Sequence, residues 1–363
     1  MSEIDRILES CIECGLCVEE CEFLKQTCDS PKDLARELGD SHPSENPRVP
    51  YSCNLCDLCE RLCPSELNLG KACLEVRHHL ASEGYCSLRS HQAVAEDREW
   101  SLSNFYLAMA DPDLDGCDSV FFPGCTLSGY SPWLVVRAYE YLKAELPPTG
   151  IILACCGNPT YSLGQEEAFQ IILREIQGSM ERLGASQIIA ACPECYHTLK
   201  YLEGLPVVSL YEVVAKQGLP ETTPAGEAVF SLHDSCSTRY EQSLQESVRE
   251  LVRQMGYRIE EMEYSRDMTR CCGMGGMAAY ADPRLANKVT RKRAREAKHD
   301  ILTYCASCRE AFAMLGKPST HVLDLIFNPD WEKERRPQPK TRDQRRENQA
   351  LLKSQFAAGL KGG

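Results

Sequence analysis

Apolar residues divide the chain into one helical region and two regions in which strand-like and helical patterns alternate. In residues 1–100 apolar positions recur every three or four residues, as in PKDLARELG (31–39) and LGKACLEVRHHLASEG (69–84), and no convincing strand appears. Residues 117–215 and 225–328 each begin with an apolar β-rich run and then alternate such runs with helical stretches. The pattern predicts an α+β multidomain protein: an all-helical domain, then two α/β domains with small parallel sheets.

The two strand-and-helix regions are copies of each other. Four segments match in the same order: SVFFPGC (119–125) with AVFSLHDSC (228–236), IILACCG (151–157) with MTRCCG (268–273), QIIAACPEC (187–195) with DILTYCASC (300–308), and VVSLYEVV (207–214) with THVLDLIF (320–327). This agreement predicts an internal duplication. Cysteines that follow strand ends would then gather at the carboxyl edge of each sheet, where open α/β sheets usually place their sites.

Charge is unevenly distributed along the chain. The formal net charge is −13, but residues 331–363 carry nine Lys/Arg and four Asp/Glu, so this stretch is +5 and the remainder is −18. An acidic body argues against nucleic-acid binding, which requires a basic face. The stretch 219–227 contains Pro and Gly and is expected to be the linker between the copies. We expect residues 329–363 to form a solvated basic C-terminal tail, with docking on an acidic partner as the alternative.

Cysteine is unusually frequent, with 22 residues in a chain of 363. No stretch approaches the ~18 apolar residues of a membrane span, and the opening MSEIDRILES lacks the basic and apolar regions of a secretory signal. We therefore expect a cytoplasmic protein, with any membrane association through partner subunits. In a reducing compartment, many cysteines indicate metal binding or catalysis, whereas a disulfide framework would need a secreted chain.

Two cysteine runs in the helical region have the spacing of iron–sulfur ligands. Residues 11–21 read CIECGLCVEEC and residues 53–64 read CNLCDLCERLCP, both with the pattern C-x-x-C-x-x-C-x-x-x-C. In bacterial ferredoxins the fourth cysteine of such a run ligates the other cluster. The runs predict two 4Fe–4S cubane clusters, one on Cys11, Cys14, Cys17 and Cys63 and the other on Cys53, Cys56, Cys59 and Cys21. The alternative is a pair of zinc sites, which usually take separated C-x-x-C pairs.

Each copy of the repeat carries five further cysteines in one order. The first set is Cys125, Cys155, Cys156, Cys192 and Cys195, and the second set is Cys236, Cys271, Cys272, Cys305 and Cys308. Five ligands exceed the four of a cubane or zinc site, and adjacent cysteines point awkwardly for one small tetrahedron. A larger or opened cluster with bridging thiolates would explain both features.

The pattern C…CCG…C-x-x-C, present twice behind the two ferredoxin runs, resembles the cysteine-rich CCG domains of heterodisulfide reductase. Over residues 1–328 the order is similar to the fused form of that family's catalytic subunit and to the iron–sulfur subunits of glycolate and lactate oxidases. The resemblance implies that each complete five-cysteine set is catalytic and holds a noncubane 4Fe–4S cluster. Gly273, Gly275 and Gly276 would keep the backbone slim beside the second cluster, expose N–H groups to sulfur and leave room for a substrate sulfur.

The resemblance implies an oxidoreductase subunit that works with a partner flavoprotein. Electrons would pass through the two cubane clusters to the noncubane clusters for reductive disulfide cleavage. The alternative is an electron-transfer subunit that relays electrons between a flavoprotein 2-hydroxy-acid dehydrogenase and quinone or another acceptor. No G-x-G-x-x-G after a strand and no Walker motif occurs, so flavin or nucleotide binding by this chain is not expected.

Several residues near the motifs have no predicted ligand role. His233 is expected to be an ordinary strand-end histidine, although tuning or protonating a thiolate is the alternative. Arg239 and Arg270 flank the second set and would either attract an anionic substrate or act as counter-charges to a cluster. The cysteines that fit no motif are expected to be plain buried thiols: Cys28, Cys73, Cys86 and Cys117.

Overall fold

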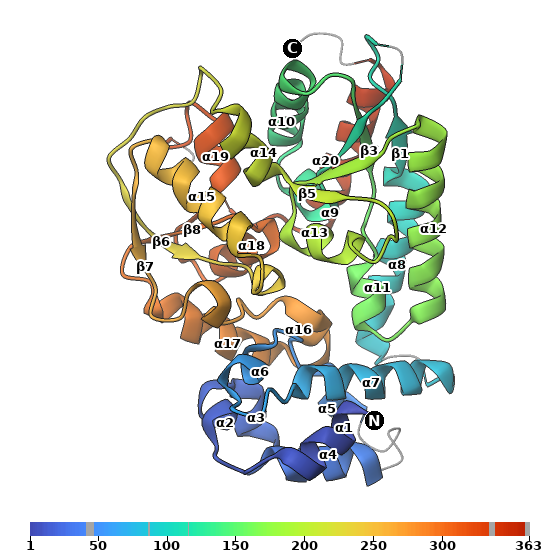
Figure 1. Ribbon diagram of the computed structural model, residues 1–363, viewed down its shortest axis with the longest axis vertical. Coiled ribbons are helices and arrows are strands. Elements are labelled where there is room, and N and C mark those ends of the chain that lie inside the picture. The colour runs from blue at the N-terminus through green and yellow to red at the C-terminus, as the bar shows by residue number, and fades with distance from the viewer. Residues whose placement is uncertain (41–46, 86–87, 115, 334–337, 360–363) are drawn as a thin grey trace.

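The computed structural model describes residues 1–40, 47–85, 88–114, 116–333 and 338–359. Figure 1 shows a helical domain at one end of the molecule and two α/β domains side by side at the other. Cys86 lies outside the described residues. Among the helices of the described ranges, none combines the length and the apolar character needed to cross a membrane.

The helical domain contains seven helices and, within residues 1–40 and 47–85, no strand, as predicted. Its core is built on fully buried apolar side chains such as Ile7, Leu34 and Ala72. Side chains cap two of its helices, because Ser2 and Asn68 accept hydrogen bonds from the first-turn N–H groups of Asp5 and Lys71. The helices are α1 (Glu3–Ser10), α2 (Leu16–Glu20), α3 (Glu22–Thr27), α4 (Pro31–Asp40), α5 (Arg48–Tyr51), α6 (Leu58–Leu62) and α7 (Leu69–Ser82).

A long connection leads from the helical domain into the first α/β domain. Helix α8 (Gln92–Trp100) and the π-helical turn Ser101–Phe105 run along this domain rather than with the helices of the helical domain (Figure 1). Arg98 donates to Gln165, and Phe105 is fully buried in the core of the α/β domains. The predicted helical domain, residues 1–100, thus ends in a helix that packs against the next domain.

The first α/β domain has a five-stranded sheet in the order β1-β3-β2-β4-β5. Four strands are parallel, and β1 pairs antiparallel with β3, upstream of the predicted start at residue 117. The strands are β1 (Leu107–Met109), β2 (Ser119–Phe122), β3 (Thr149–Leu153), β4 (Gln187–Ala190) and β5 (Val207–Ser209). The helices are α9 (Cys125–Tyr130), α10 (Pro132–Glu145), α11 (Asn158–Ser162), α12 (Glu166–Leu183), α13 (Pro193–Leu199) and α14 (Leu210–Gln217).

The second α/β domain repeats this topology in an all-parallel sheet, β7-β6-β8-β9. The order matches β3-β2-β4-β5 strand for strand, so the structure supports the duplication read from the sequence. The strands are β6 (Val229–His233), β7 (Arg258–Glu261), β8 (Asp300–Thr303) and β9 (Ser319–His321). The helices are α15 (Gln242–Gln254), α16 (Ala278–Ala281), α17 (Pro283–Glu296), α18 (Ala306–Met314) and α19 (Val322–Phe327).

One hydrophobic core joins the two copies. It contains buried side chains from both sheets, including Phe121 of β2 and Phe230 of β6. Across the contact, the rings of Tyr211 and Tyr304 meet edge to face with centroids 5.7 Å apart, and the Tyr211 hydroxyl donates to the Tyr304 carbonyl. The cysteine-bearing edges of the two sheets are therefore held in a fixed relation by apolar packing.

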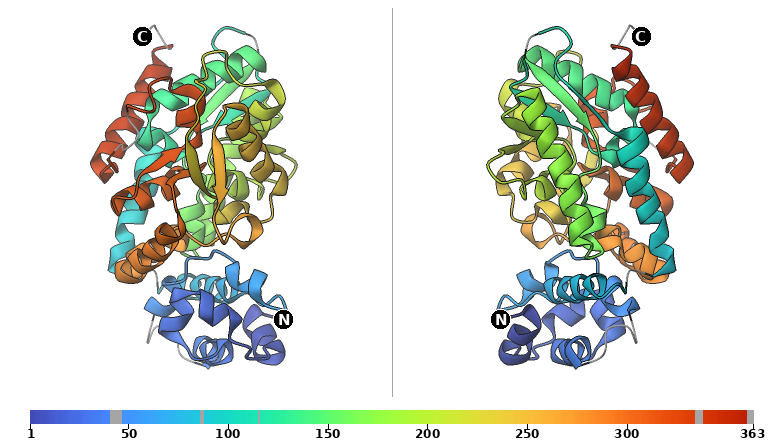
Figure 2. Two further views of the ribbon diagram at one scale, coloured as in Figure 1. Left: turned by 90° about the vertical axis from the view of Figure 1, so that its left-hand side faces the viewer. Right: turned by 90° about the vertical axis from the view of Figure 1, so that its right-hand side faces the viewer.

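The expectation of a solvated tail is wrong for residues 342–357, which form helix α20 (Arg342–Ala357). Leu352 and Phe356 are fully buried, and the Phe356 ring packs edge to face on Tyr139 of α10. Two basic residues of the helix, Arg342 and Arg346, bind Asp97 of the same chain at 2.8 Å. The basic segment is thus docked on the first α/β domain and α8, as Figure 2 also shows at the edge of the molecule.

Candidate functional site

The two ferredoxin-type runs are turns that each lead into a short helix. Helix α2 begins after Gly15 at φ +79°, and α6 begins after Asp57 at φ +56°, so each turn needs a residue in the left-handed conformation. Backbone N–H groups donate to thiol sulfur in both turns, from Glu13 to Cys11 at 3.4 Å and from Leu55 to Cys53 at 3.5 Å. The turns place sulfur atoms and amide donors together, as an iron–sulfur cluster requires.

The thiols of the two runs gather in the crossed groups that the spacing predicts. The Cys17 thiol interacts electrostatically with the thiols of Cys63, Cys11 and Cys14. Burial and these neighbours raise the pKa of Cys17 to about 12. Burial and the neighbouring Cys56 and Cys53 likewise raise the pKa of Cys21 to about 12. Each fourth cysteine therefore lies with the leading cysteines of the other run.

The first five-cysteine set lies at the carboxyl ends of three adjacent strands. Cys125 opens α9 after β2, the pair Cys155–Cys156 follows β3, and Cys192 is the N-cap of α13 after β4. Thiol–thiol interactions run through the set in the order Cys125, Cys155, Cys156, Cys195, Cys192. The backbone leaves little space beside them, because a Cβ on Gly124 would lie 2.8 Å from the Cys195 Sγ.

The second set repeats the same order of thiol contacts, Cys236, Cys271, Cys272, Cys308, Cys305. Its adjacent pair, however, does not follow a strand. Strand β7 ends at Glu261, and residues 262–270 intervene before Cys271. We call residues 262–270 the junction loop, because Asp267 forms an ion pair with Arg61 at 2.6 Å and Arg270 forms one with Glu20, both in the helical domain.

Hydrogen bonds from neighbouring thiols lower the pKa of the middle cysteine of each set. Hydrogen bonds from Cys155 and Cys195 lower the pKa of Cys156 below its ordinary value. In the second set, hydrogen bonds from Cys271 and Cys308 lower the pKa of Cys272 in the same way. Thiolates are the form in which cysteine binds metals, so this residue of each copy is prepared for ligation.

The second set lies directly against the second ferredoxin run. The thiols of Cys56 and Cys271 interact, and this contact with burial raises the pKa of Cys56 well above its ordinary value. A cavity of about 50 Å³ lies among these sulfur atoms, and its lining includes Cys17, Cys21, Cys53, Cys56, Cys59 and Cys271. None of the described cysteines forms a disulfide. Grouped, buried thiols around a small cavity with amide donors fit an iron–sulfur cluster.

The glycines of CCGMGG have different neighbours from those we expected. A Cβ on Gly276 would lie 2.6 Å from the Cys53 carbonyl oxygen, and one on Gly275 would lie 2.5 Å from the Asn54 carbonyl oxygen. The missing side chains therefore admit the backbone of the second ferredoxin run, rather than leaving space for a substrate. The predicted amide donor is present, since the Gly273 N–H donates to the Cys271 Sγ at 3.2 Å.

A pocket of about 210 Å³ opens beside the first set and is lined by Cys125 and Cys155. Met274 of CCGMGG forms part of the opposite wall. Helix α20 closes a third side, where the Gln349 side chain donates to the Cys125 carbonyl at 2.9 Å. The first set thus faces a cavity large enough for part of a small molecule, bordered by both copies.

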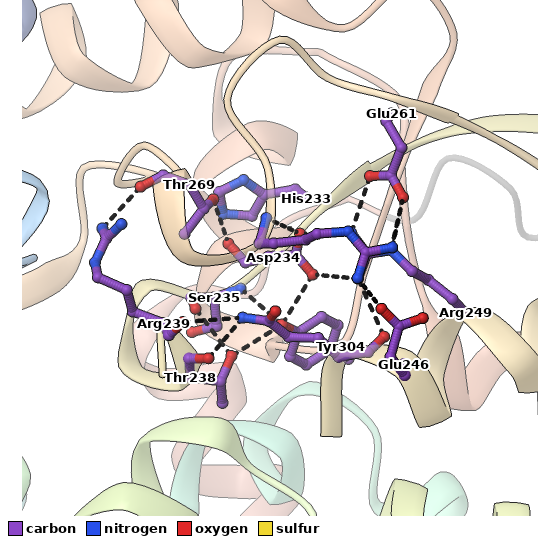
Figure 3. A network of polar contacts seen from close by, with 12 residues as sticks. His233, Asp234, Ser235, Thr238, Arg239, Glu246, Arg249, Glu261, Thr269 and Tyr304 are labelled. Atoms are coloured by element: carbon purple, nitrogen blue, oxygen red, sulfur yellow. Dashed lines mark hydrogen bonds and ion pairs between the residues drawn. The ribbon is translucent and has the colours of Figure 1, made fainter. Parts of the chain in front are cut away.

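A polar network supports the backbone around Cys236. Figure 3 shows the Arg249 guanidinium between Asp234 and Glu261, which it binds at 2.8 Å and 2.6 Å. The Tyr304 hydroxyl also donates to Asp234 at 3.1 Å. His233 belongs to this cluster but contacts the second set as well: its ring and the sulfur atoms of Cys272 and Cys308 lie within 4.8 Å of one another.

The remaining predicted residues have mainly structural surroundings. Arg270 is paired with Glu20 and Glu296, so it is not a free anion-binding group. Cys117 is buried, as expected, and its thiol donates to the Ser119 carbonyl at 3.1 Å. Cys28 is half-buried. Cys73 is fully buried and its thiol interacts with that of Cys53, so it lies beside the second run.

Sequence reasoning missed two residues near the clusters. Arg77 of α7 is fully buried and donates to the Cys53 carbonyl at 2.7 Å, although nothing in its helical stretch distinguishes it. Glu194, between Cys192 and Cys195, lines a pocket of about 350 Å³ that also contains Cys236. Burial raises the pKa of Glu194 to about 7. Its position in C-P-E-C, where the second copy has C-A-S-C, was the available signal.

Known protein families match the chain in three places. Residues 10–68 match the 4Fe-4S dicluster domain, and residues 119–200 and 230–313 each match the Cysteine-rich domain, CCG. Matches at these positions agree with the sets of cysteines described above.

Several known proteins are similar to this chain over most of its length. An uncharacterized iron-sulfur protein of Methanocaldococcus jannaschii is 26% identical, over 84% of this chain and 68% of that protein. One subunit of the dihydromethanophenazine:CoB–CoM heterodisulfide reductase of Methanosarcina mazei is 24% identical, over 88% and 91%. One subunit of the fumarate reductase (CoM/CoB) of Methanothermobacter marburgensis is 24% identical, over 88% and 71%. These relatives are oxidoreductase subunits or iron–sulfur proteins by name.

Proposed function

We propose that this chain, an iron–sulfur electron-transfer subunit of the heterodisulfide reductase type with two CCG domains, is itself the site of reductive disulfide cleavage. The two ferredoxin-type runs would hold cubane clusters, and each five-cysteine set would hold a noncubane 4Fe–4S cluster. Electrons would enter the helical domain from a partner, which we propose to be a flavoprotein in a larger complex. They would leave on the sulfur atoms of a disulfide.

The observation that carries the proposal is the completeness of both five-cysteine sets, the first of which lines a pocket. The five corresponding thiols of each copy interact in the same order. The pocket beside Cys125 and Cys155 is also lined by Met274 of the other copy, so a molecule in it would contact the first set and the segment that follows Cys271 and Cys272. A relay that passes electrons only to another protein has no need for such a cavity at its terminal cysteines.

The reaction requires two electrons and two protons, which convert one disulfide into two thiols. When bound, the clusters would supply electrons one at a time and iron sites for the separated sulfur atoms. The chain's residues would hold the clusters and shape the pocket. Glu194, which lies beside Cys236 and whose pKa is about 7, is positioned near a site where protons are consumed.

Metal and cofactor content tests the cluster assignment. Four 4Fe–4S clusters contain about sixteen iron atoms per chain. An anaerobically prepared sample should therefore give about that iron content with EPR signals of more than two cluster types. A preparation with about eight iron atoms and only cubane signals would contradict the proposal, and stoichiometric zinc would favour zinc sites instead.

The alternative function is a relay of electrons from a flavoprotein that oxidises a 2-hydroxy acid to quinone or another acceptor. The two functions differ when the reduced chain is tested alone. Under the proposal, dithionite-reduced protein freed of excess reductant should cleave an added dithiol-derived disulfide and release thiol in proportion to electrons lost. Under the alternative, the disulfide should remain intact while a quinone analogue is reduced.

A further inference from the structure

Five arginines are buried in the described structure, and they differ in how their charge is balanced. Three have carboxylate partners: Arg249 binds Asp234 and Glu261, Arg293 binds Glu296, and Arg309 binds Glu310. The other two, Arg77 and Arg239, are 0% and 2% exposed and have no carboxylate within 4.0 Å among the described residues. The two without a carboxylate are the two that contact the second ferredoxin run.

Arg77 satisfies its guanidinium entirely with backbone carbonyl groups. It donates to Pro50 and Cys53 of the second run at 2.7 Å each. It also donates to Gly276 of the second copy at 2.8 Å and to Ser162 of the first copy at 2.6 Å. One side chain therefore ties the second run to both CCG domains.

Arg239 repeats this arrangement from the opposite side of the junction. It follows Cys236 by three residues and donates to the Cys56 carbonyl at 2.7 Å and 3.0 Å. It also donates to the carbonyl groups of Asp267 and Thr269 in the junction loop, and Figure 3 shows it reaching Thr269. Both unpaired arginines thus link the second run to the second set.

A buried cation without a counter-ion is strongly unfavourable, because carbonyl dipoles compensate only part of the lost hydration. The Cys53 thiol lies beside Arg77 and the Cys56 thiol beside Arg239, which also interacts with the nearby Asp57 carboxylate. The two thiols become anionic when they bind metal. Thiolates that carry a reduced cluster are the negative charge that these two arginines would balance. Net charge around a cluster is one of the levers that set its reduction potential.

His233 adds a hydrogen-bond donor on the same side. Its Nδ1 accepts from the Arg293 Nε at 3.0 Å, so the neutral ring carries its hydrogen on Nε2. That Nε2 is buried and has no protein partner in the described structure, and a nitrogen of the ring lies within 4.8 Å of the sulfur atoms of Cys272 and Cys308. An N–H directed at cluster sulfur stabilises the reduced state.

The first copy has none of these groups at the matching positions. When Cys125 is aligned with Cys236, Phe122 stands in place of His233 and Ser128 in place of Arg239. Phe122 is fully buried, and the Ser128 hydroxyl donates to the Gly124 carbonyl at 2.8 Å. At these matched positions the positive charge and the hydrogen-bond donor therefore belong to the second copy alone.

We propose that Arg77, Arg239 and His233 are positioning residues that raise the reduction potentials of the clusters on the second run and the second CCG set, so that the second copy receives electrons from the helical domain. The first copy lacks these groups and faces the pocket. It would receive its electrons from the second copy, or act together with the second copy on the substrate. The inference rests on the proposed function only in that all four cysteine groups hold clusters. It does not depend on the substrate.

The test is an EPR-monitored redox titration of the full, cluster-loaded chain. Variants R77Q, R239Q and H233F are compared with the unchanged protein, and H233F introduces the residue that the first copy has. Signals are assigned with Cys14→Ser for the first run and Cys272→Ser for the second set. In R77Q and R239Q the second-run and second-set potentials should fall by at least the equivalent of a tenfold lower equilibrium constant, about 59 mV for a one-electron couple. H233F should lower only the second-set potential.

The controls separate charge from general damage. The double variant D234N/R249Q removes a buried arginine together with its buried carboxylate partner, so it leaves the net charge of this pair unchanged; it should lower thermal stability and leave the potentials unchanged. R239K keeps the charge and should recover most of the shift. If R239Q loses its clusters, R77Q and H233F still decide. Unchanged potentials in R77Q, R239Q or H233F, or an equal shift in D234N/R249Q, would overturn the proposal. If the potentials shift as expected but the unchanged protein cleaves no disulfide, the result counts against the proposed function and not against this inference.

Discussion

The two CCG copies share a ligand pattern but differ in what surrounds it. In the first, the adjacent cysteines follow β3 directly and Cys125 and Cys155 line a pocket. In the second, the junction loop separates β7 from Cys271, and the set lies against the second ferredoxin run. The duplicated sheet holds the same five thiols in both places. The loops between strands decide whether the set faces a cavity or another electron carrier.

Removing one ligand from each copy in turn should show the largest difference between the two copies. Cys272→Ser and Cys156→Ser delete the central thiolate of their sets, and each should lose one cluster, about four iron atoms. Cys272→Ser should also block reduction of the first set from the helical domain. Cys156→Ser should leave the second set reducible. Stopped-flow absorbance and EPR of samples frozen during reduction measure both. Equal reduction of the surviving set in the two variants would show that the copies are interchangeable.

The docking of α20 concerns the first copy alone. Phe356→Ala removes a fully buried ring from Tyr139 and should lower the free energy of unfolding by about 3–5 kcal/mol. Leu351→Ala, on the same helix but 51% exposed, is the matched control and should change it by less than about 0.5 kcal/mol. Denaturant unfolding followed by circular dichroism measures the difference. A similar small effect for both variants would mean that the helix is not docked in solution.

The glycine contact concerns the second copy alone. Gly276→Ala places a Cβ 2.6 Å from the Cys53 carbonyl oxygen, whereas Gly204→Ala meets nothing within 4 Å. Both glycines have positive φ, so the backbone strain of roughly 1–2 kcal/mol is common to the two variants. The further loss in Gly276→Ala, roughly 1–3 kcal/mol, reports overpacking at the junction. Thermal melts of the two variants should differ accordingly, and equal melting temperatures would contradict the contact.

Acid should lower the free energy of unfolding through His91, which is 1% exposed. Its ring packs on Tyr51 of the helical domain and on Tyr280 of the second copy. Burial, with the nearby Arg77, lowers its pKa to about 4. In the unfolded chain His91 is protonated below about pH 6.5, whereas in the folded chain it stays neutral to about pH 4. The free energy of unfolding therefore falls as the pH drops below about 6.5. The loss is about 1.4 kcal/mol at about pH 5.5. His91→Phe should remove this dependence in denaturant unfolding compared between neutral pH and about pH 5.5, while the exposed His79→Gln should retain it.

Local patterns predicted the fold because they follow from short-range physics. Apolar periodicity predicted the helical first domain, and the matched strands β2 with β6 and β4 with β8 predicted the duplicated parallel sheets. Matching MTRCCG to IILACCG misplaced the strand, since β7 ends at Glu261 and the junction loop lies between it and Cys271. Cysteine identity dominated that match. The chain between the strand and the cysteines can change length freely, as surface loops do.

The cysteine groups were readable from spacing, but their surroundings were not. Thiols must converge on a cluster wherever the chain leads, so ligands leave a pattern in the sequence. Arg77 and Arg239 act through contacts between domains, and α20 binds residues far away in the sequence, such as Asp97. Those contacts depend on how folded domains meet. A basic stretch reads the same whether it is solvated or docked on its own chain.

The docked helix α20 also orders the assembly of the protein during translation. Gln349 reaches the Cys125 carbonyl across a sequence separation of 224 residues. The helical domain can fold soon after it leaves the ribosome, because domains generally fold as units from the N-terminus. The pocket beside Cys125 and Cys155 gains its third wall only when the residues behind the second copy have been synthesised. The thiols of Cys125 and Cys155 therefore stay more accessible until the end of the chain has been synthesised.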